Sequence, residues 1–268
     1  MNQLELIAEN IKNKNLDKAL ELCKLNENSD DKSIIYNFIG VIHFMKKNLA
    51  EAENFFLKVI EIDDKFQDPI RNLCVIYAIT KKFKELLNYS TKLYYLDNKN
   101  PLNIFQIGSA NELNKNYDEA IKYYEKYINT DGSDKKRGFN NIGNIFLRKG
   151  KPKTSVKYFS KALELDKNNK ILVNNILLCY LYLRDENKAE EYFKIAENID
   201  SNYIEFLHNK AEFLILKNQI QEAEKILENN KGITKFLITL IRLYFNSGQS
   251  NKGNELLNQS REILKNNS

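Results

Sequence analysis

Residues 141–166 read NIGNIFLRKGKPKTSVKYFSKALELD, and this stretch contains two amphipathic helical patterns on either side of a turn at Gly150 and Pro152. Apolar or small residues recur in each pattern at steps of three and four, which places them on one face of a helix. The first pattern begins at Phe139, just before the quoted stretch, and continues with Ile142, Gly143 and Phe146; the second has Ser155, Phe159 and Ala162. A helical hairpin is therefore predicted, and the small residues Gly143 and Ser155 should let its two helices approach closely.

The same double pattern recurs along the chain with a period of about 34 residues, as in Tyr36, Ile39 and Gly40 followed by Ala52 and Phe56. A hairpin of this length cannot bury its apolar face alone, so neighbouring hairpins must stack. We divide the sequence into a partial repeat at 1–32 and seven repeats at 33–66, 67–100, 101–135, 136–169, 170–203, 204–233 and 234–268. Each repeat is expected to form a first and a second helix.

These repeats resemble the tetratricopeptide repeat family. Beside the stretch at 141–166, the resemblance rests on the segments 48–52 and 116–120, and on an aspartate near the end of the second helix in five repeats: Asp63, Asp97, Asp131, Asp166 and Asp200. The family's usual proline near position 32 of the repeat is absent. The resemblance covers the whole chain and implies an all-α fold, a right-handed α-solenoid superhelix of about seven helix-turn-helix repeats with a partial N-terminal one.

Three departures from the pattern predict local irregularities. Leu86 and Ser90 replace the usual small residue and ring in repeat 67–100, so its packing should be less regular. The segment 131–138 contains two glycines and one extra residue, which makes it the best hinge candidate. Repeat 234–268 ends in a polar capping helix around Gln259, Arg261 and Lys265, as expected of a terminal repeat.

A side-chain amide stands at the sixth position of five consecutive repeats: Asn72, Gln106, Asn141, Asn175 and Asn209. A carboxamide both donates and accepts hydrogen bonds. First helices packed about 8–10 Å apart would present one amide for about every three residues of an extended strand. The file resembles the substrate-holding ladder in the repeats of O-linked N-acetylglucosamine transferases, whose catalytic portion has no room in this chain. Asn is also common at this position in such repeats whatever they bind.

By resemblance, positions 2, 5, 6, 9 and 13 of the first helix line the concave groove where ligands of the family lie, and here they form a polar, amide-rich surface. Phe105, Leu178 and Tyr182 are candidate pockets for partner side chains. Besides the five amides, the predicted peptide-binding residues are Asn140, Asn144, Arg71, Arg137, Tyr182 and His208.

Enzyme chemistry is not indicated. The sequence contains no glycine-rich phosphate loop, no paired histidines for a metal, and no Cys or Ser partner for His43 or His208. Cys23, Cys74 and Cys179 have no metal-site or disulfide spacing and are expected in the core. We therefore predict no catalytic residue, no metal and no cofactor.

Charge and hydropathy favour a cytoplasmic protein without membrane insertion, because the N-terminus has no signal-peptide pattern and no apolar run approaches the roughly 20 residues that cross a bilayer. The 41 basic and 36 acidic residues are interspersed, which favours a solvated surface over a nucleic-acid footprint. The predicted function is a noncatalytic protein–protein interaction scaffold that binds an extended peptide or partner protein. Two alternatives are a substrate-recruiting accessory of a separate glycosyl- or sulfo-transferase and a helical-repeat RNA-binding protein. The sequence leaves partner identity and oligomeric state open.

Overall fold

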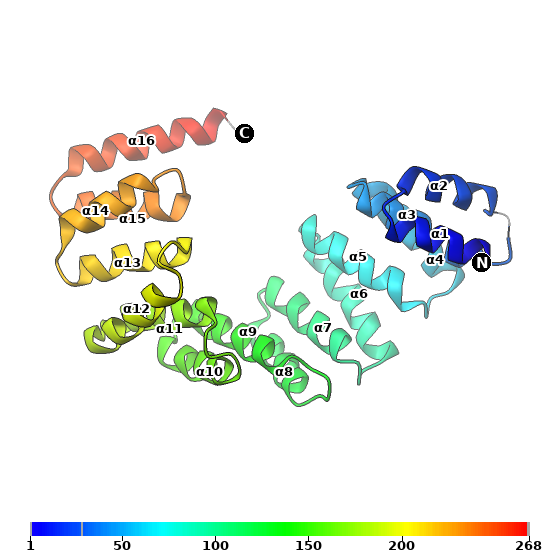
Figure 1. The fold of residues 1–268 in the computed structure, drawn as a ribbon, viewed down its shortest axis with the longest axis horizontal. Helices are drawn as coiled ribbons and strands as arrows, with labels where there is room; N and C mark the ends of the chain where they lie inside the picture. The colour runs from blue at the N-terminus through cyan, green and yellow to red at the C-terminus, as the bar shows by residue number, and fades with distance from the viewer. Residues whose placement is uncertain (1, 28, 267–268) are drawn as a thin grey trace. The chain divides into compact units, whose positions relative to one another are not determined.

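The computed structural model describes residues 2–27 and 29–266, with side chains as far as Ser260, and this part of the chain has sixteen helices and no strand (Figure 1). The first helices of the hairpins are α1 (Gln3–Lys12), α3 (Lys32–Met45), α5 (Gln67–Ile79), α7 (Pro101–Leu113), α9 (Lys135–Arg148), α11 (Lys170–Leu183), α13 (Ile204–Leu216) and α15 (Thr234–Asn246). The second helices are α2 (Leu16–Leu25), α4 (Leu49–Ile62), α6 (Phe83–Leu96), α8 (Tyr117–Ile128), α10 (Pro152–Leu165), α12 (Glu186–Asp200), α14 (Ile220–Asn229) and α16 (Ser250–Asn266). The all-α prediction is confirmed.

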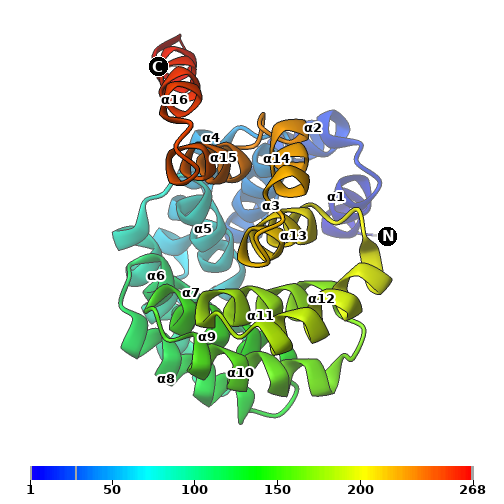
Figure 2. The same ribbon diagram turned by 90° about the vertical axis from the view of Figure 1, so that its left-hand side faces the viewer.

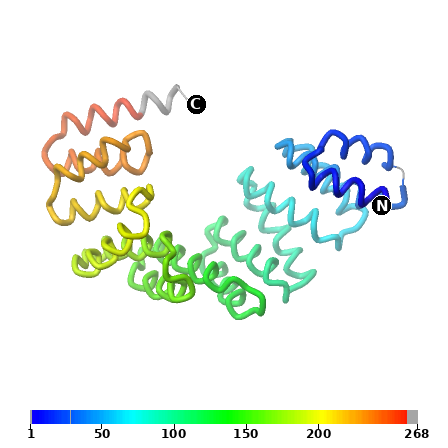
Figure 3. The backbone as a smooth tube through the Cα atoms, in the orientation of Figure 1, coloured from blue at the N-terminus to red at the C-terminus, as the bar shows by residue number. Residues whose placement is uncertain are grey.

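The partial N-terminal repeat contains a complete but short hairpin of α1 and α2 (Figure 3). The two helices have 10 residues each and bury Ile7, Ala19 and Cys23. At the other end of the chain, Gln259 lies on α16 and is exposed, as expected of a polar cap. The side chains of Arg261 and Lys265, the other residues predicted for this cap, lie outside the described part of the structure.

Close approach of the two helices explains the glycine and ring pattern that defines the hairpins. Phe159 is fully buried, and a Cβ atom added to Gly143 would lie 2.5 Å from Cε1 of its ring. Gly40 faces Phe56 in the same way, at 2.6 Å. The hydroxyl of buried Ser155 donates to the Gly143 carbonyl at 2.8 Å, so the small residues do bring the helices together.

The three cysteines lie in the core, as predicted, and are free. Burial raises the pKa of the Cys74 thiol to about 11 and those of Cys23 and Cys179 to about 12, so all three stay protonated at neutral pH. In repeat 67–100, the Sγ atom of Cys74 lies 3.5 Å from Oγ of Ser90. The departure at Ser90 is thus accommodated by a polar contact inside the core.

The chain forms two compact units, unit 1 at 1–138 and unit 2 at 139–268. The boundary falls at the end of segment 131–138, the hinge candidate. Within unit 2, α11 contacts α10, α12 and α13 (Figure 2). No helix in the described residues has the length and hydropathy of a membrane span.

Candidate peptide-binding site

A pocket of about 610 Å³ opens between α11, α13 and α15 in unit 2, within the usual size range of ligand sites. Its lining includes Tyr182 and His208, both predicted to bind peptide, and Leu178, a predicted pocket residue. The Tyr182 side chain is 65% exposed, although a large ring normally packs in the interior. The remaining lining residues are Leu181, Arg184, Glu212, Ile215, Leu216, Arg242 and Asn246. The structure thus brings three of the predicted positions together on one apolar surface with a polar wall.

A hydrogen-bonded chain forms the polar wall of this pocket. Arg242 Nη2 donates to both carboxylate oxygens of Glu212, each at 2.6 Å, and the Thr239 hydroxyl donates to Glu212 Oε1 at 3.2 Å. His208 Nε2 lies 3.0 Å from Thr239 Oγ1. These contacts join His208 and Glu212 of α13 to Thr239 and Arg242 of α15.

Burial is the main reason that the pKa of His208 is lowered from its ordinary value, and Glu212 opposes this effect. His208 is therefore neutral at pH 7, and Glu212 neutralises Arg242. Arg184, at the rim, takes part in no ion pair within the described residues, so the pocket carries a net positive charge.

Glu212 and Arg242 stand at positions expected from the sequence to line the groove, but neither they nor Thr239 were among the predicted peptide-binding residues. Glu212 and Arg242 both occupy the ninth position of adjacent repeats, and opposite charges at equivalent positions would have identified the pair. The role of Thr239 follows only from its contact with His208 across two helices.

The five amides have different environments. Asn209 is 4% exposed, and its Nδ2 donates to the Asn174 carbonyl at 3.1 Å, so it joins α13 to α11 instead of facing solvent. Asn175 donates to Asn140 Oδ1 at 3.4 Å, which links α11 to α9. The remaining file members and Asn144 are half-buried, and within the described residues their side chains make no hydrogen bond: Asn72, Gln106, Asn141 and Asn144. These four carboxamides are therefore available to a ligand.

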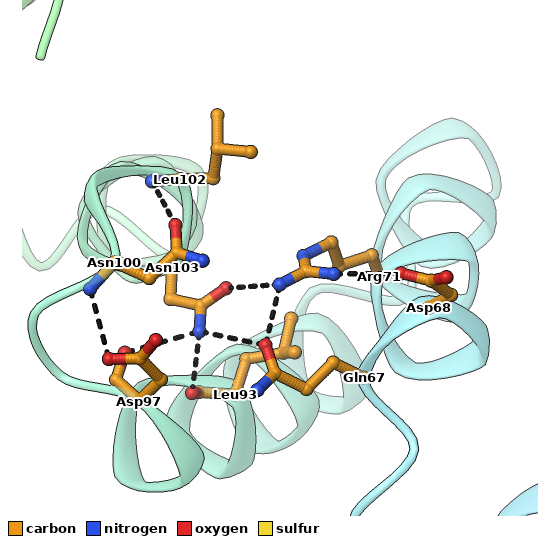
Figure 4. Close-up of polar contacts among 8 residues, drawn as sticks. All are labelled: Gln67, Asp68, Arg71, Leu93, Asp97, Asn100, Leu102 and Asn103. Atoms are coloured by element: carbon orange, nitrogen blue, oxygen red, sulfur yellow. Dashed lines mark hydrogen bonds and ion pairs between the residues drawn. The ribbon is translucent and has the colours of Figure 1, made fainter. Parts of the chain in front are cut away.

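Two predicted arginines lie in unit 1 and interact with the fold. Arg71 donates to Asp68 at 2.9 Å, to Gln67 at 2.5 Å and to Asn103 at 3.3 Å (Figure 4). The guanidinium carbon of Arg137 lies 3.8 Å from the centre of the Phe105 ring. Phe105 is 9% exposed, so its expected role as an open pocket is wrong: the ring packs on other aromatic residues of unit 1 and is covered by Arg137.

The first helices of unit 1 expose apolar residues at their ninth and thirteenth positions. Met45 is 39% exposed on α3, Val75 and Ile79 are 42% and 56% exposed on α5, and Leu113 is 39% exposed on α7. The expectation of a polar, amide-rich face along the whole chain is therefore wrong for unit 1, where this set, here called the apolar strip, accompanies Asn72 and Gln106. In the described residues no group of three or more His, Cys, Asp or Glu side chains could hold a metal ion.

Comparison with known proteins identifies the repeats. Residues 34–66, 103–134 and 137–169 match family models described as tetratricopeptide repeat. The type IV pilus assembly protein PilF of Pseudomonas aeruginosa is 23% identical over 173 residues, which are 64% of this chain and 69% of that protein.

Solved structures show the same fold. A tetratricopeptide repeat protein from Parabacteroides merdae has a TM-score of 0.70 and 14% identity, over 91% of this chain and 97% of that one. YrrB, whose structure is described as that of a TPR protein with an unusual peptide-binding site, has a TM-score of 0.52 and 18% identity, over 72% of this chain and 97% of that one. At these identities the likeness concerns the fold alone.

Proposed function

Because the chain contains tetratricopeptide repeats, we propose that it is a noncatalytic scaffold that binds an extended segment of a partner protein. Unit 2 binds this segment on the face formed by α9, α11, α13 and α15. The observation that carries the proposal is the pocket beside Tyr182 and His208, which combines an apolar floor with a positively charged rim. YrrB provides a precedent for peptide binding by this fold.

The pocket binds one partner side chain, and the amides bind the partner's backbone. A net hydrogen bond contributes about 0.5–1.5 kcal/mol, whereas association costs an estimated 4–15 kcal/mol. The amides Asn141 and Asn144 alone are therefore too few for useful affinity. Burial of an apolar side chain against Leu178, Tyr182 and Leu216 supplies the larger contribution.

The two alternatives differ in how well the side chains support them. RNA binding would use a series of exposed rings for base stacking. Tyr95 on α6 is exposed, but the second-helix rings Phe56, Tyr124 and Phe159 are fully buried. An accessory of a separate transferase would use the same face as the scaffold, so it differs only in the partner that the face receives.

Replacing Tyr182 with alanine should weaken peptide binding about tenfold or more, because the pocket loses its most exposed wall. The test begins with a random-peptide display selection against the whole chain, followed by titration of enriched peptides against the variant. Tyr95→Ala is a matched control, since Tyr95 is 78% exposed on α6 in unit 1. Enriched peptides that bind the Tyr182 variant as tightly as the original chain would contradict the proposed pocket.

The double variant Asn141→Ala with Asn144→Ala should bind the same peptides several-fold more weakly, because the two carboxamides of unit 2 that are available to a ligand are lost. Helix content and melting temperature should stay near those of the original chain, since neither side chain is fully buried. Asn209→Ala is the contrasting control, because its loss removes a buried bond between α13 and α11 and lowers stability. Unchanged affinity of the double variant would rule out a role for these amides.

A further inference from the structure

A file of basic residues runs along unit 1 at the turns between first and second helices. Lys47, Lys81 and Lys115 occupy the same place in successive hairpins, with φ of 63°, 58° and 63°. All three are exposed, and within the described residues none of them forms an ion pair. Their neighbours Lys46 and Lys82 do, with Asp17 and Glu53. The file therefore presents three uncompensated charges, one per repeat.

The backbone at these turns favours glycine. The backbone N–H of the residue after each lysine donates to the carbonyl of the residue five positions earlier, as Asn48 does to His43. This hydrogen bond at the end of the helix needs a residue in the left-handed conformation between them. The same turn holds Gly150 with φ of 68° and Gly248 with φ of 77° in unit 2. Lysine is strained in this conformation whereas glycine is not. In unit 2 this turn also holds Arg184 and Asn218, whereas every hairpin of unit 1 has a lysine there, Lys14 included.

The apolar strip runs beside this file. Met45, Ile79 and Leu113 each precede a turn lysine by two residues and are at least 39% exposed. Every one of these three hairpins therefore ends its first helix with an exposed apolar side chain followed by an unpaired cation. A surface of this composition is complementary to a ligand with an apolar face bordered by negative charge.

We propose that unit 1 binds an acidic amphipathic helix of a partner protein, with apolar residues on the strip and carboxylates on Lys47, Lys81 and Lys115. First helices packed about 8–10 Å apart match seven residues of a helix, about 10.5 Å, and residues seven apart lie on one helix face. Three residues of a β-strand cover a similar length, but the side chains of a strand alternate between its two faces. Every third residue of a strand therefore cannot stay on the face that meets unit 1. The proposal concerns a different unit from the pocket at Tyr182 and does not depend on it.

The triple variant Lys47→Gly, Lys81→Gly and Lys115→Gly separates recognition from folding. Its melting temperature should rise, because strain is removed, while binding to the probe should fall about tenfold, because three ion pairs are lost. The probe is a fluorescein-labelled 21-residue peptide of three heptads with Leu on one face and Glu along its border. Binding to the whole chain is measured by fluorescence anisotropy. A peptide with Lys in place of Glu should not bind.

Matched variants complete the test. Lys→Arg at the three turns should keep the affinity, and Ile79→Ser should lower it. Asn218→Gly, at a left-handed turn of unit 2, should leave it unchanged. The proposal is overturned if the original chain does not bind the probe or if the triple variant binds equally well. It is also overturned if the turn lysines instead mediate co-sedimentation with phosphatidylserine vesicles or binding to single-stranded RNA.

Discussion

Replacing Phe159 with alanine should lower the free energy of unfolding of unit 2 by about 3–5 kcal/mol, one of the largest effects expected of a single substitution in this chain. The ring is fully buried in a cluster with Ala162, Leu172 and Ile176, and it fills the space left by the missing side chain of Gly143. Truncation leaves a cavity between α9, α10 and α11, because these helices cannot move close enough together to fill the space of the ring.

Urea unfolding followed by circular dichroism measures this loss. Leu165→Ala is the control on the same helix, since Leu165 is 56% exposed and its truncation should change stability by less than about 1 kcal/mol. In a repeat array each hairpin contacts only its neighbours, so a local loss of packing weakens the nearest hairpins most. The transition of unit 2 should therefore shift while that of unit 1 shifts much less.

The contact between Phe159 and Gly143 can be tested in the reverse direction. Gly143→Ala alone should cost about 1–3 kcal/mol, because its methyl group would lie 2.5 Å from the ring. Combined with Phe159→Ala, the same methyl group enters the cavity, so the double variant should lose less than the sum of the two single losses. Strictly additive losses would contradict direct packing of residue 143 against the ring.

The sequence predicts the fold well because each repeat encodes its own packing. Gly143, Ser155 and Phe159 stand at fixed positions of their repeat. A contact inside the hairpin requires a small residue or a ring at each of these positions, so the pattern recurs with a period of 34 residues. The small first hairpin at α1 and α2 was harder to identify, because its helices have 10 residues each and the repeat pattern is incomplete there.

The site was only partly predictable because repeat position does not determine which neighbour a side chain meets. Asn141 and Asn209 stand at the same place in their repeats, yet Asn209 is buried and bonded to Asn174, while Asn141 is half-buried and makes no side-chain bond in the described residues. Their difference arises from contacts between first helices, which no single repeat encodes. The pocket at Tyr182 likewise requires three helices together.

Asn103 illustrates a structural role that the repeat pattern conceals. Its side chain is fully buried at the start of α7, and Nδ2 donates to the carbonyls of Leu93 at 3.0 Å and Asp97 at 3.2 Å (Figure 4). Carbonyls at the end of a helix lack partners within it, so Asn103 closes the end of α6. Its Oδ1 accepts from Arg71 on α5, which joins three helices through one amide.

Replacing Asn103 with leucine should therefore lower the free energy of unfolding of unit 1 by about 2–4 kcal/mol, because the Asp97 carbonyl and the Arg71 guanidinium lose a buried partner. Urea unfolding measures the loss, and Asn129→Leu, at the exposed end of α8, is the matched control. Asn103→Asp isolates the donor role: it keeps the acceptor for Arg71 but places a carboxylate against two carbonyls. Because the bonds that Nδ2 donates close the end of α6, the aspartate variant should be destabilised as well. If that variant is as stable as the original chain, the stabilisation comes from the bond between Oδ1 and Arg71 instead.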